Sequence, residues 1–284
     1  MIQTIRQVKS RIRSIENTRK LTRAMEMVSS AKFNAVENKQ FAALKYFFKL
    51  EALLRDVLPQ ADGYLHPLLR PPAKSEKALL CVVASDTGLC AAYNHNILKL
   101  AEGFLKRNNF AHLELITVGR KAYRYFSRAG FKIAHSFLEL RGRFSEGLLS
   151  DVDLLLREKF TSGAADEVDV AYTHFESASR HKPFIEKVLN IEFSQSSEKD
   201  FIFEPRRDAL LNELIPAYFS SKIRIVLLDA FSSEHASRMI AMGEATRNAR
   251  ELLEGLILTR NKMRQEIITR EIMEVISTAE ALRG

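Results

Sequence analysis

The stretch that decides the fold is MGEATRNARELLEGLILTRNKM, residues 242–263. Small and apolar residues recur in it at alternating spacings of three and four, at Met242, Ala245, Ala249, Leu252, Leu256, Thr259 and Met263. A seven-residue repeat with two such positions is typical of a helix that packs along another helix in a left-handed supercoil. After one skip the pattern resumes at Ile268, Ile272, Val275, Ala279 and Leu282. The C-terminal part of the chain is therefore predicted to be one helix of a coiled coil.

The N-terminal end has a similar pattern and lacks helix breakers. Ile5, Val8, Ile12 and Ile15 follow the pattern first, and Leu21, Met25 and Val28 resume it after a shift of phase. No proline precedes Pro59 and no glycine precedes Gly63, and these two residue types most disfavour a helix. We expect shaft helices over residues 1–58 and 208–284, the second kinked or broken near Pro216. Because an isolated helix is marginally stable in water, the two are expected to pair antiparallel.

Residues 76–192 have a different pattern. Lys77–Ala84 (KALLCVVA) is a continuous apolar run with the length of a buried strand. Further strands are expected at residues 113–118, 131–137, 168–175 and 188–193, and helices at 94–106, 120–128 and 145–160. Strands that alternate with helices predict βαβ units and a largely parallel sheet. The expected fold class is α/β: an antiparallel coiled coil of long N- and C-terminal helices with an inserted Rossmann-like α/β domain.

The positive charge of the chain is concentrated at one end. The net charge is +8, and residues 1–58 hold twelve Lys or Arg against five Asp or Glu, whereas residues 232–284 hold eight of each. A basic helix suits nucleic acid, an anionic membrane surface or an acidic protein partner, and charge alone does not choose among them. The sequence has no run of 18 apolar residues, so no membrane-spanning helix is expected.

One polar turn stands where α/β folds place ligand sites. Ser85–Cys90 (SDTGLC) directly follows the first predicted strand. It matches neither GxGxxG, nor Walker A, nor GxSxG, so it either has a structural or partner-contact role or binds a small anion. The basic pairs Arg141–Arg143 and Arg206–Arg207 are typical of solvated surface, with phosphate contact as the other reading. The spacings of the cysteines and histidines indicate no catalytic, cofactor or metal site.

Four longer strings resemble the gamma subunit of F-type ATP synthases. At the N-terminal end they are IRQVKSRI at 5–12 and NTRKLTRAMEMV at 17–28; at the C-terminal end, EHASRMIAM at 234–242 and NKMRQEIITREI at 261–272. The SDTGLC turn is also similar to a motif of that family, and the resemblance covers essentially the whole chain. The family commonly has Arg where Thr87 stands, Gly where Ala91 stands and an acidic residue where Arg247 stands.

The resemblance implies a central-stalk rotor subunit without cofactors or chemistry of its own. Its partners would be a ring of alpha and beta subunits that holds the nucleotide sites, an epsilon subunit and a membrane ring of c subunits. Proton flow would turn the shaft and so couple to ATP synthesis or hydrolysis. By motif matching, the contacts with the ring would come from Arg23, Met25, Arg238, Gln265, Thr269 and Glu271. The expected location is peripheral, on the cytoplasmic face of a bacterial inner membrane, with attachment only through partners.

Two other classes of function compete with the rotor. A nucleic-acid-binding coiled coil would explain the basic helix, but it would need many phosphate contacts, and the C-terminal helix has no net charge. A small-ligand α/β enzyme with helical arms would need an assembled site, which the residue spacings do not supply. The sequence therefore favours a rotor that binds no nucleic acid.

Overall fold

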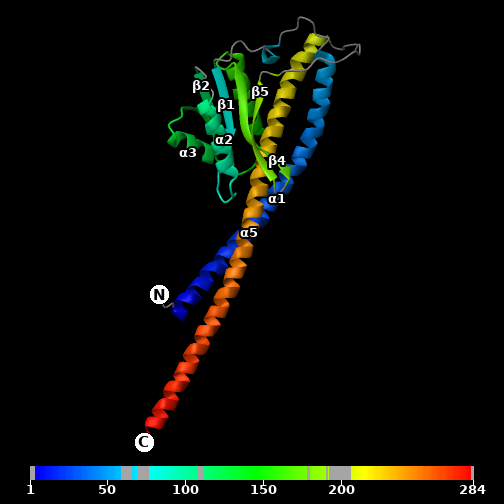
Figure 1. The fold of residues 1–284 in the computed structure, drawn as a ribbon. Coiled ribbons are helices and arrows are strands. Elements are labelled where there is room, and N and C mark those ends of the chain that lie inside the picture. Colours follow the sequence, from blue (N-terminus) through cyan, green and yellow to red (C-terminus); the bar gives the residue numbers. More distant parts are fainter. Residues whose placement is uncertain are drawn as a thin grey trace. The chain divides into compact units, whose positions relative to one another are not determined.

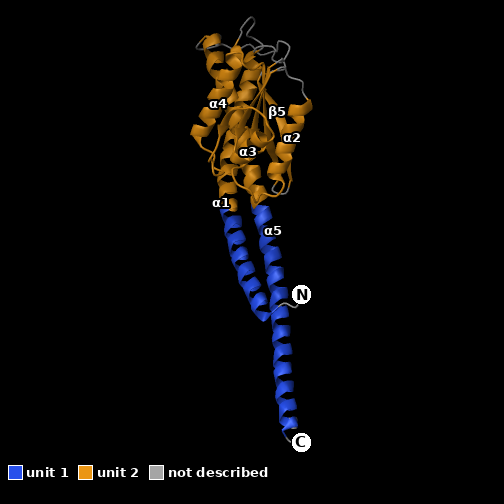
Figure 2. Cartoon of the chain, turned by 90° about the vertical axis from the view of Figure 1, so that its left-hand side faces the viewer, with its two compact units in different colours: residues 1–28, 239–284 blue, residues 29–238 orange. Residues whose placement is uncertain are grey.

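The computed structural model describes residues 4–58, 66–69, 77–107, 112–177, 180–189, 191 and 206–282. The chain forms two compact units, one made of residues 1–28 and 239–284 and the other of residues 29–238 (Figure 2). Two long helices, α1 (Ile5–Val57) and α5 (Arg207–Ala281), contribute to both units. The predicted fold class, with long terminal helices and an inserted α/β domain, is confirmed.

In the first unit α1 and α5 lie side by side and run in opposite directions (Figure 2). Val8, Ile12 and Leu253 form its buried apolar cluster, against which Ile15, Leu256, Ile257 and Met263 pack. The hydroxyl of Thr246 donates a hydrogen bond of 2.9 Å to the hydroxyl of Thr22, farther along the same pair. The seam between the helices is thus apolar at one end and polar toward the other.

The seam follows a different set of residues from the one predicted. Leu21, Val28 and Leu252 are 62%, 57% and 59% exposed, whereas Thr22 and Leu253 are buried. On α1 the buried or half-buried residues continue the first heptad without a shift of phase, through Val8, Ile12, Ile15, Arg19, Thr22 and Glu26. The predicted shift is therefore wrong. Spacings of three and four can be drawn through either of two neighbouring apolar residues, and only the partner helix selects one.

The last part of α5 has no buried residues among those described. Every residue from 264 to 279 is exposed, including Ile267, Ile268, Ile272, Met273, Val275 and Ile276. The second part of the predicted seven-residue repeat lies in this segment from Ile268 to Ala279. Its apolar residues do not pack against α1 in this chain.

The second unit contains a five-stranded sheet (Figure 1). Its strands are β1 (Lys77–Val83), β2 (His112–Val118), β3 (Ile133–Phe137), β4 (Glu167–Ser177) and β5 (Arg180–Leu189). Their order is β3-β2-β1-β4-β5, and every pair is parallel except β4 with β5. The sheet is largely parallel, as predicted, but the last strand begins at Arg180 rather than 188. Pro183 obscured its pattern, and a proline is tolerated there because β5 is an edge strand.

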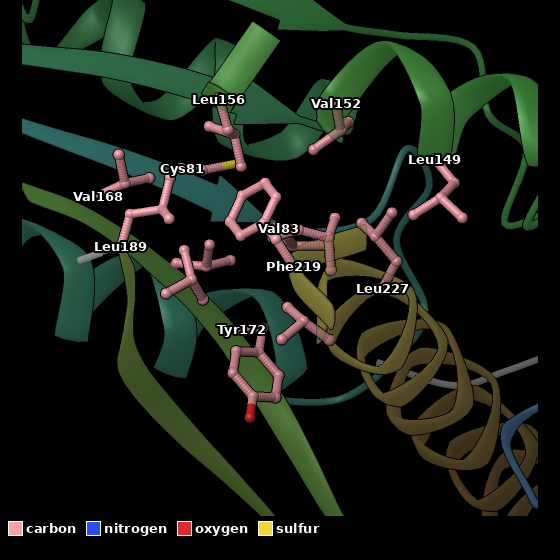
Figure 3. Packing of buried hydrophobic residues seen from close by; sticks show 14 of the residues in the cluster. Cys81, Val83, Leu149, Val152, Leu156, Val168, Tyr172, Leu189, Phe219 and Leu227 are labelled. Atoms are coloured by element: carbon pink, nitrogen blue, oxygen red, sulfur yellow. The ribbon is translucent and has the colours of Figure 1, made fainter. Parts of the chain in front are cut away.

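Helices cover both faces of this sheet. They are α2 (Tyr93–Arg107), α3 (Arg120–Arg128) and α4 (Glu146–Thr161), together with the adjoining parts of α1 and α5; a short 3-10 helix spans Pro67–Leu69. One apolar cluster joins α2 and α3 to the sheet, and a larger one joins α4, α5 and α1 to it. Figure 3 shows part of the larger cluster, with Leu149, Val152, Leu156, Phe219 and Leu227 gathered around Cys81 and Val83.

Pro216 does not end a helix, contrary to one of the two outcomes predicted for it. It lies inside α5, which continues on both sides of it. A proline removes the hydrogen bond to the carbonyl four residues earlier, here Asn212. Leu211, Ile215 and Phe219 are buried in the core around it, so packing holds the helix together across this position.

Candidate functional site

The six residues predicted to contact a partner fall into three places. Arg23 and Met25 lie on α1 in the first unit, and Gln265, Thr269 and Glu271 lie on the exposed end of α5 in the same unit. Arg238 belongs to the second unit and is only 6% exposed. The structure therefore does not gather these residues into one cluster.

Arg23 and Met25 are far along the shaft from Gln265. The guanidinium of Arg23 is exposed and lies 3.2 Å from the Glu26 carboxylate, while Met25 is half-buried. The hydrogen bond between Thr22 and Thr246 sets these residues level with the region near 246 of α5. From there to Gln265 a helix rises about 30 Å at 1.5 Å per residue. Two separate surfaces are thus available to a partner.

The exposed end of α5 presents its polar residues on more than one side. Gln265 and Thr269 are four residues apart and share a helical face. Glu271 follows Thr269 by two residues, which turns it roughly 200° around the axis. All three are exposed, and apolar residues such as Ile268 and Ile272 lie between them. At 100° per residue the three span an arc of about 160°, so a partner that contacts all three has to cover nearly half of the helix circumference.

Arg238 is the centre of a buried polar network in the second unit. Its Nη1 lies 2.7 Å from the Glu234 carboxylate, one helical turn earlier. Its Nη2 donates to the carbonyl and the hydroxyl of Thr87 at 3.2 and 3.1 Å, and its Nε donates to the carbonyl of Gly88 at 3.2 Å. The guanidinium thereby fastens α5 to the Ser85–Cys90 turn.

His235 extends this network to the loop before α4. Its Nε2 lies 2.7 Å from the carbonyl oxygen of Gly142, which can only accept, so Nε2 carries the proton. The unprotonated Nδ1 then accepts from Nη1 of Arg238 at 3.4 Å. Burial lowers the pKa of His235 to about 4, which keeps the ring neutral at physiological pH. Burial also raises the pKa of the Glu234 carboxyl, and the charge of Arg238 acts against that shift.

The Ser85–Cys90 turn is occupied by groups of its own chain. Asp86 accepts hydrogen bonds from the backbone N–H of Arg120 at 3.0 Å and of Arg141 at 2.6 Å. Ser85 and Asn94 bond to each other, and Arg238 covers the carbonyls of Thr87 and Gly88. The structure thus favours the structural reading of this turn over anion binding. Asp86, Glu234 and His235 escaped prediction; the one signal available was the i,i+4 spacing of Glu234 and Arg238.

The described part of the chain offers little for covalent chemistry. Within it, no group of three His, Cys, Asp or Glu side chains could hold a metal ion. Both cysteines are free and buried, and burial raises the pKa of each thiol, which makes them poor nucleophiles. None of the described helices is long and apolar enough to cross a membrane. What remains are the two shaft surfaces and the Arg238 network.

The chain is similar to known proteins over nearly its whole length. The family model described as ATP synthase matches residues 4–282. The ATP synthase gamma chain of Chloroherpeton thalassium is 32% identical over 298 residues, which cover 98% of each chain. A chain in the Euglena gracilis mitochondrial ATP synthase, solved with OSCP, F1 and c-ring in rotational state 3, superposes with a TM-score of 0.69 at 19% identity, covering 98% of this chain and 94% of that one. A chain of the rotor from the same organism gives 0.64 at 18% identity, covering 93% and 98%.

Proposed function

The chain belongs to the ATP synthase gamma chain family, and from this premise we propose that it is the central-stalk rotor subunit of an F-type ATP synthase. It couples proton flow through a membrane ring of c subunits to ATP synthesis or hydrolysis in a ring of alpha and beta subunits. The solved chains with the same fold come from rotor and F1–c-ring assemblies, which supports these partners. An epsilon subunit is the further partner expected of the stalk.

The observation that carries the proposal is the exposed end of α5. Its residues 264–279 are all exposed, and six of them are large apolar residues between 42% and 68% exposed. Apolar side chains grouped in this way mark a surface that is covered in an assembly. At 100° per residue these side chains span about two thirds of the helix circumference, so the cover has to reach most of the way around it, as a ring of subunits does.

The same geometry supplies the asymmetry that rotary coupling needs. A single helix presents a different set of side chains in each direction, so three equivalent sites around it meet three different surfaces. A shaft can shift a conformational equilibrium only through contacts that differ between states. Turning the helix exchanges those contacts among the three sites, and the affinity of each site for nucleotide changes in turn.

The chain acts without chemistry of its own in this proposal. Nucleotide sites lie on the ring, and the gamma chain contributes contact surfaces and stiffness. Its place is peripheral, at the cytoplasmic face of a bacterial inner membrane, with attachment through the other subunits. The bacterial source of the relative supports that location. The alternative of a nucleic-acid-binding coiled coil gains no support from the comparisons.

Reconstitution tests the proposal directly. The full chain would be combined with its cognate alpha and beta subunits, and ATP hydrolysis and rotation of a probe fixed to this chain would be measured. We expect a stoichiometric complex in which hydrolysis drives rotation. A chain that fails to enter the ring, or a complex that hydrolyses ATP with this chain stationary, would contradict the rotor assignment.

A further inference from the structure

A cavity of about 260 Å³ opens between α1 and the loop that precedes α4. It lies wholly within the second unit, and its lining consists of Lys32, Ala35, Val36, Lys39, Gly142, Arg143 and Phe144. Three of these residues are cations and none is acidic. Ala35, Val36 and Phe144 are the apolar side chains of the lining.

The three cations lack acidic partners within the described chain. None of the ion pairs found among the described residues includes Lys32, Lys39 or Arg143. The ammonium of Lys32 donates to the carbonyl of Arg141 at 2.7 Å, which leaves two of its three N–H groups. Burial, followed by the charge of Arg143, lowers the pKa of Lys32, and the charge of Glu234 acts against that shift.

The carboxylates nearby are already taken. Glu146, on which the charge of Lys39 acts, is held by the Arg224 guanidinium through two contacts of 2.7 Å. Glu234, whose charge acts on Lys32, is buried and paired with Arg238. A free anion would therefore supply what the chain does not.

The loop that forms one wall is held rigidly in an unfavourable conformation. Glu139 and Arg141 have φ of 63° and 51°, a region that side chains other than glycine seldom adopt. Asp86 holds the N–H of Arg141, and His235 holds the carbonyl of Gly142. A Cβ at position 142 would lie 2.7 Å from a carbon of the His235 ring. Arg143 is therefore presented from a wall with little freedom to move, which lowers the entropy lost when a ligand binds.

The aromatic residue of the cavity is not available for stacking a base. Phe144 is 8% exposed, and Lys39 and Arg224 lie over its ring at 5.6 and 5.7 Å from the centroid. Cations that lie over an aromatic ring occupy the surface on which a base would stack. The cavity thus offers charge for phosphate oxygens and no platform for a nucleobase.

We propose that this cavity is an anion-binding site for a condensed phosphate, with Lys32, Lys39 and Arg143 as its ligands. Three cations match the charge of a diphosphate better than that of a single phosphate, and the volume admits two phosphoryl groups. The group can come from free pyrophosphate or from a nucleoside diphosphate. This site goes beyond the rotor function and does not depend on it.

Isothermal titration of the purified full chain with pyrophosphate at fixed ionic strength tests the site. We expect one site per chain, and binding at least tenfold weaker in Lys39→Gln and in Arg143→Gln. Lys49→Gln is the matched control, because it removes the same charge from an exposed position of the same helix outside the cavity. Lys32→Gln also loses the hydrogen bond to Arg141, so thermal unfolding would accompany its titration.

Three further ligands are titrated: ADP, inorganic phosphate and an acidic peptide. They distinguish a nucleoside diphosphate from free phosphate compounds, and an anion from an acidic protein partner. ADP is expected to bind within a few-fold of pyrophosphate, because its base meets no stacking surface, and inorganic phosphate is expected to bind more weakly. Absence of pyrophosphate binding, or equal weakening by Lys39→Gln and Lys49→Gln, would overturn the proposal. So would binding of an acidic peptide that depends on Lys39 while pyrophosphate fails to compete. Because no other subunit is present, failure here leaves the rotor assignment untouched.

Discussion

At the scale of single residues, Arg238 shows how a motif and a structure answer different questions. Motif matching places it among the contacts with the ring, and the structure shows its guanidinium buried and bonded to Thr87, Gly88 and His235. The contact with a partner stays a prediction. The structure adds that Arg238 ties α5 to the Ser85–Cys90 turn, so a substitution there changes the chain before it changes any interface.

This role predicts a large loss of stability for Arg238→Ala. The substitution leaves the Glu234 carboxylate buried and unpaired, and breaking a buried ion pair from one side costs about 3–5 kcal/mol. Urea denaturation followed by circular dichroism measures the free energy of unfolding. Arg247→Ala serves as control: its guanidinium is 71% exposed and 3.5 Å from Glu244, so a change below about 1 kcal/mol is expected. Similar losses in both variants would refute a special role for the buried pair.

A second residue-scale prediction concerns the pH dependence of stability. Burial, together with the nearby Glu167 carboxylate, raises the pKa of Asp169 from 3.8 to about 6. The folded state then retains a proton that the unfolded state has released, so stability falls as pH rises through this interval. Asp169→Asn is expected to raise the free energy of unfolding by up to about 3 kcal/mol above about pH 7 and to have no effect below about pH 3.

The measurement is a series of urea titrations between those two pH values. Asp151→Asn is the matched control, because Asp151 is an exposed carboxylate on α4. It should leave the pH profile of the wild-type chain unchanged. A gain from Asp169→Asn that is the same at low and high pH would show that titration of this carboxyl is not its cause.

At the scale of elements, the seven-residue repeat predicts that α1 and α5 pair, but it does not determine which of their residues form the seam. The sequence correctly predicted that both ends are long helices and that they pair antiparallel. It assigned Leu252 to the seam, but Leu252 is 59% exposed and Leu253 is 4% exposed. Both residues are leucine, so the seven-residue spacing could pass through either one. The side chains of α1 decide which of them is covered.

This pair of leucines gives a sharp test of the seam. Leu253→Ala is expected to destabilise the pairing of α1 with α5 by about 2–4 kcal/mol, because it removes a buried side chain from a small cluster. Leu252→Ala, one residue earlier in the same helix, is expected to cost less than about 0.5 kcal/mol. Hydrogen exchange of amides in residues 5–20 measures the local opening. Equal destabilisation by Leu252→Ala and Leu253→Ala would contradict the assignment of Leu253, rather than Leu252, to the seam.

At the scale of the whole molecule, the working surface is one that the chain leaves uncovered. Gln265, Thr269 and Glu271 lie where every described neighbour on α5 is exposed. A side chain in this segment is exposed and does not pack against the rest of the described chain. Its effect on function has to arise through a partner, and this separates it from Arg238.

Gln265→Leu should therefore change coupling without changing the fold. We expect its thermal midpoint to stay within about 1 °C of the wild-type chain, since exposed helix positions seldom affect stability. In the complete synthase, with its membrane ring of c subunits in sealed vesicles, ATP synthesis at a fixed proton gradient is expected to fall several-fold. Glu251→Gln, exposed on the same helix but outside the matched motif, is the control. Normal synthesis in the Gln265 variant would remove this residue from the predicted contacts.

The sequence by itself determined the long helices, the largely parallel sheet and the family, because each rests on a pattern repeated over many residues. These patterns are the absence of Pro and Gly, the seven-residue spacing and four long motifs. A prediction from such a long pattern stays correct when one position is misassigned, as Leu252 was. The strand at 180–189 was misplaced because one proline masked a short pattern.

Only the tertiary structure decided which residues meet. The pairing of Thr22 with Thr246, the enclosure of Arg238 by the Ser85–Cys90 turn and the gathering of Lys32, Lys39 and Arg143 each join residues more than 100 positions apart. Local spacing carries no information about such contacts. They follow from the order of strands in the sheet and from which faces of α1 and α5 become buried, and these are properties of the packed chain as a whole.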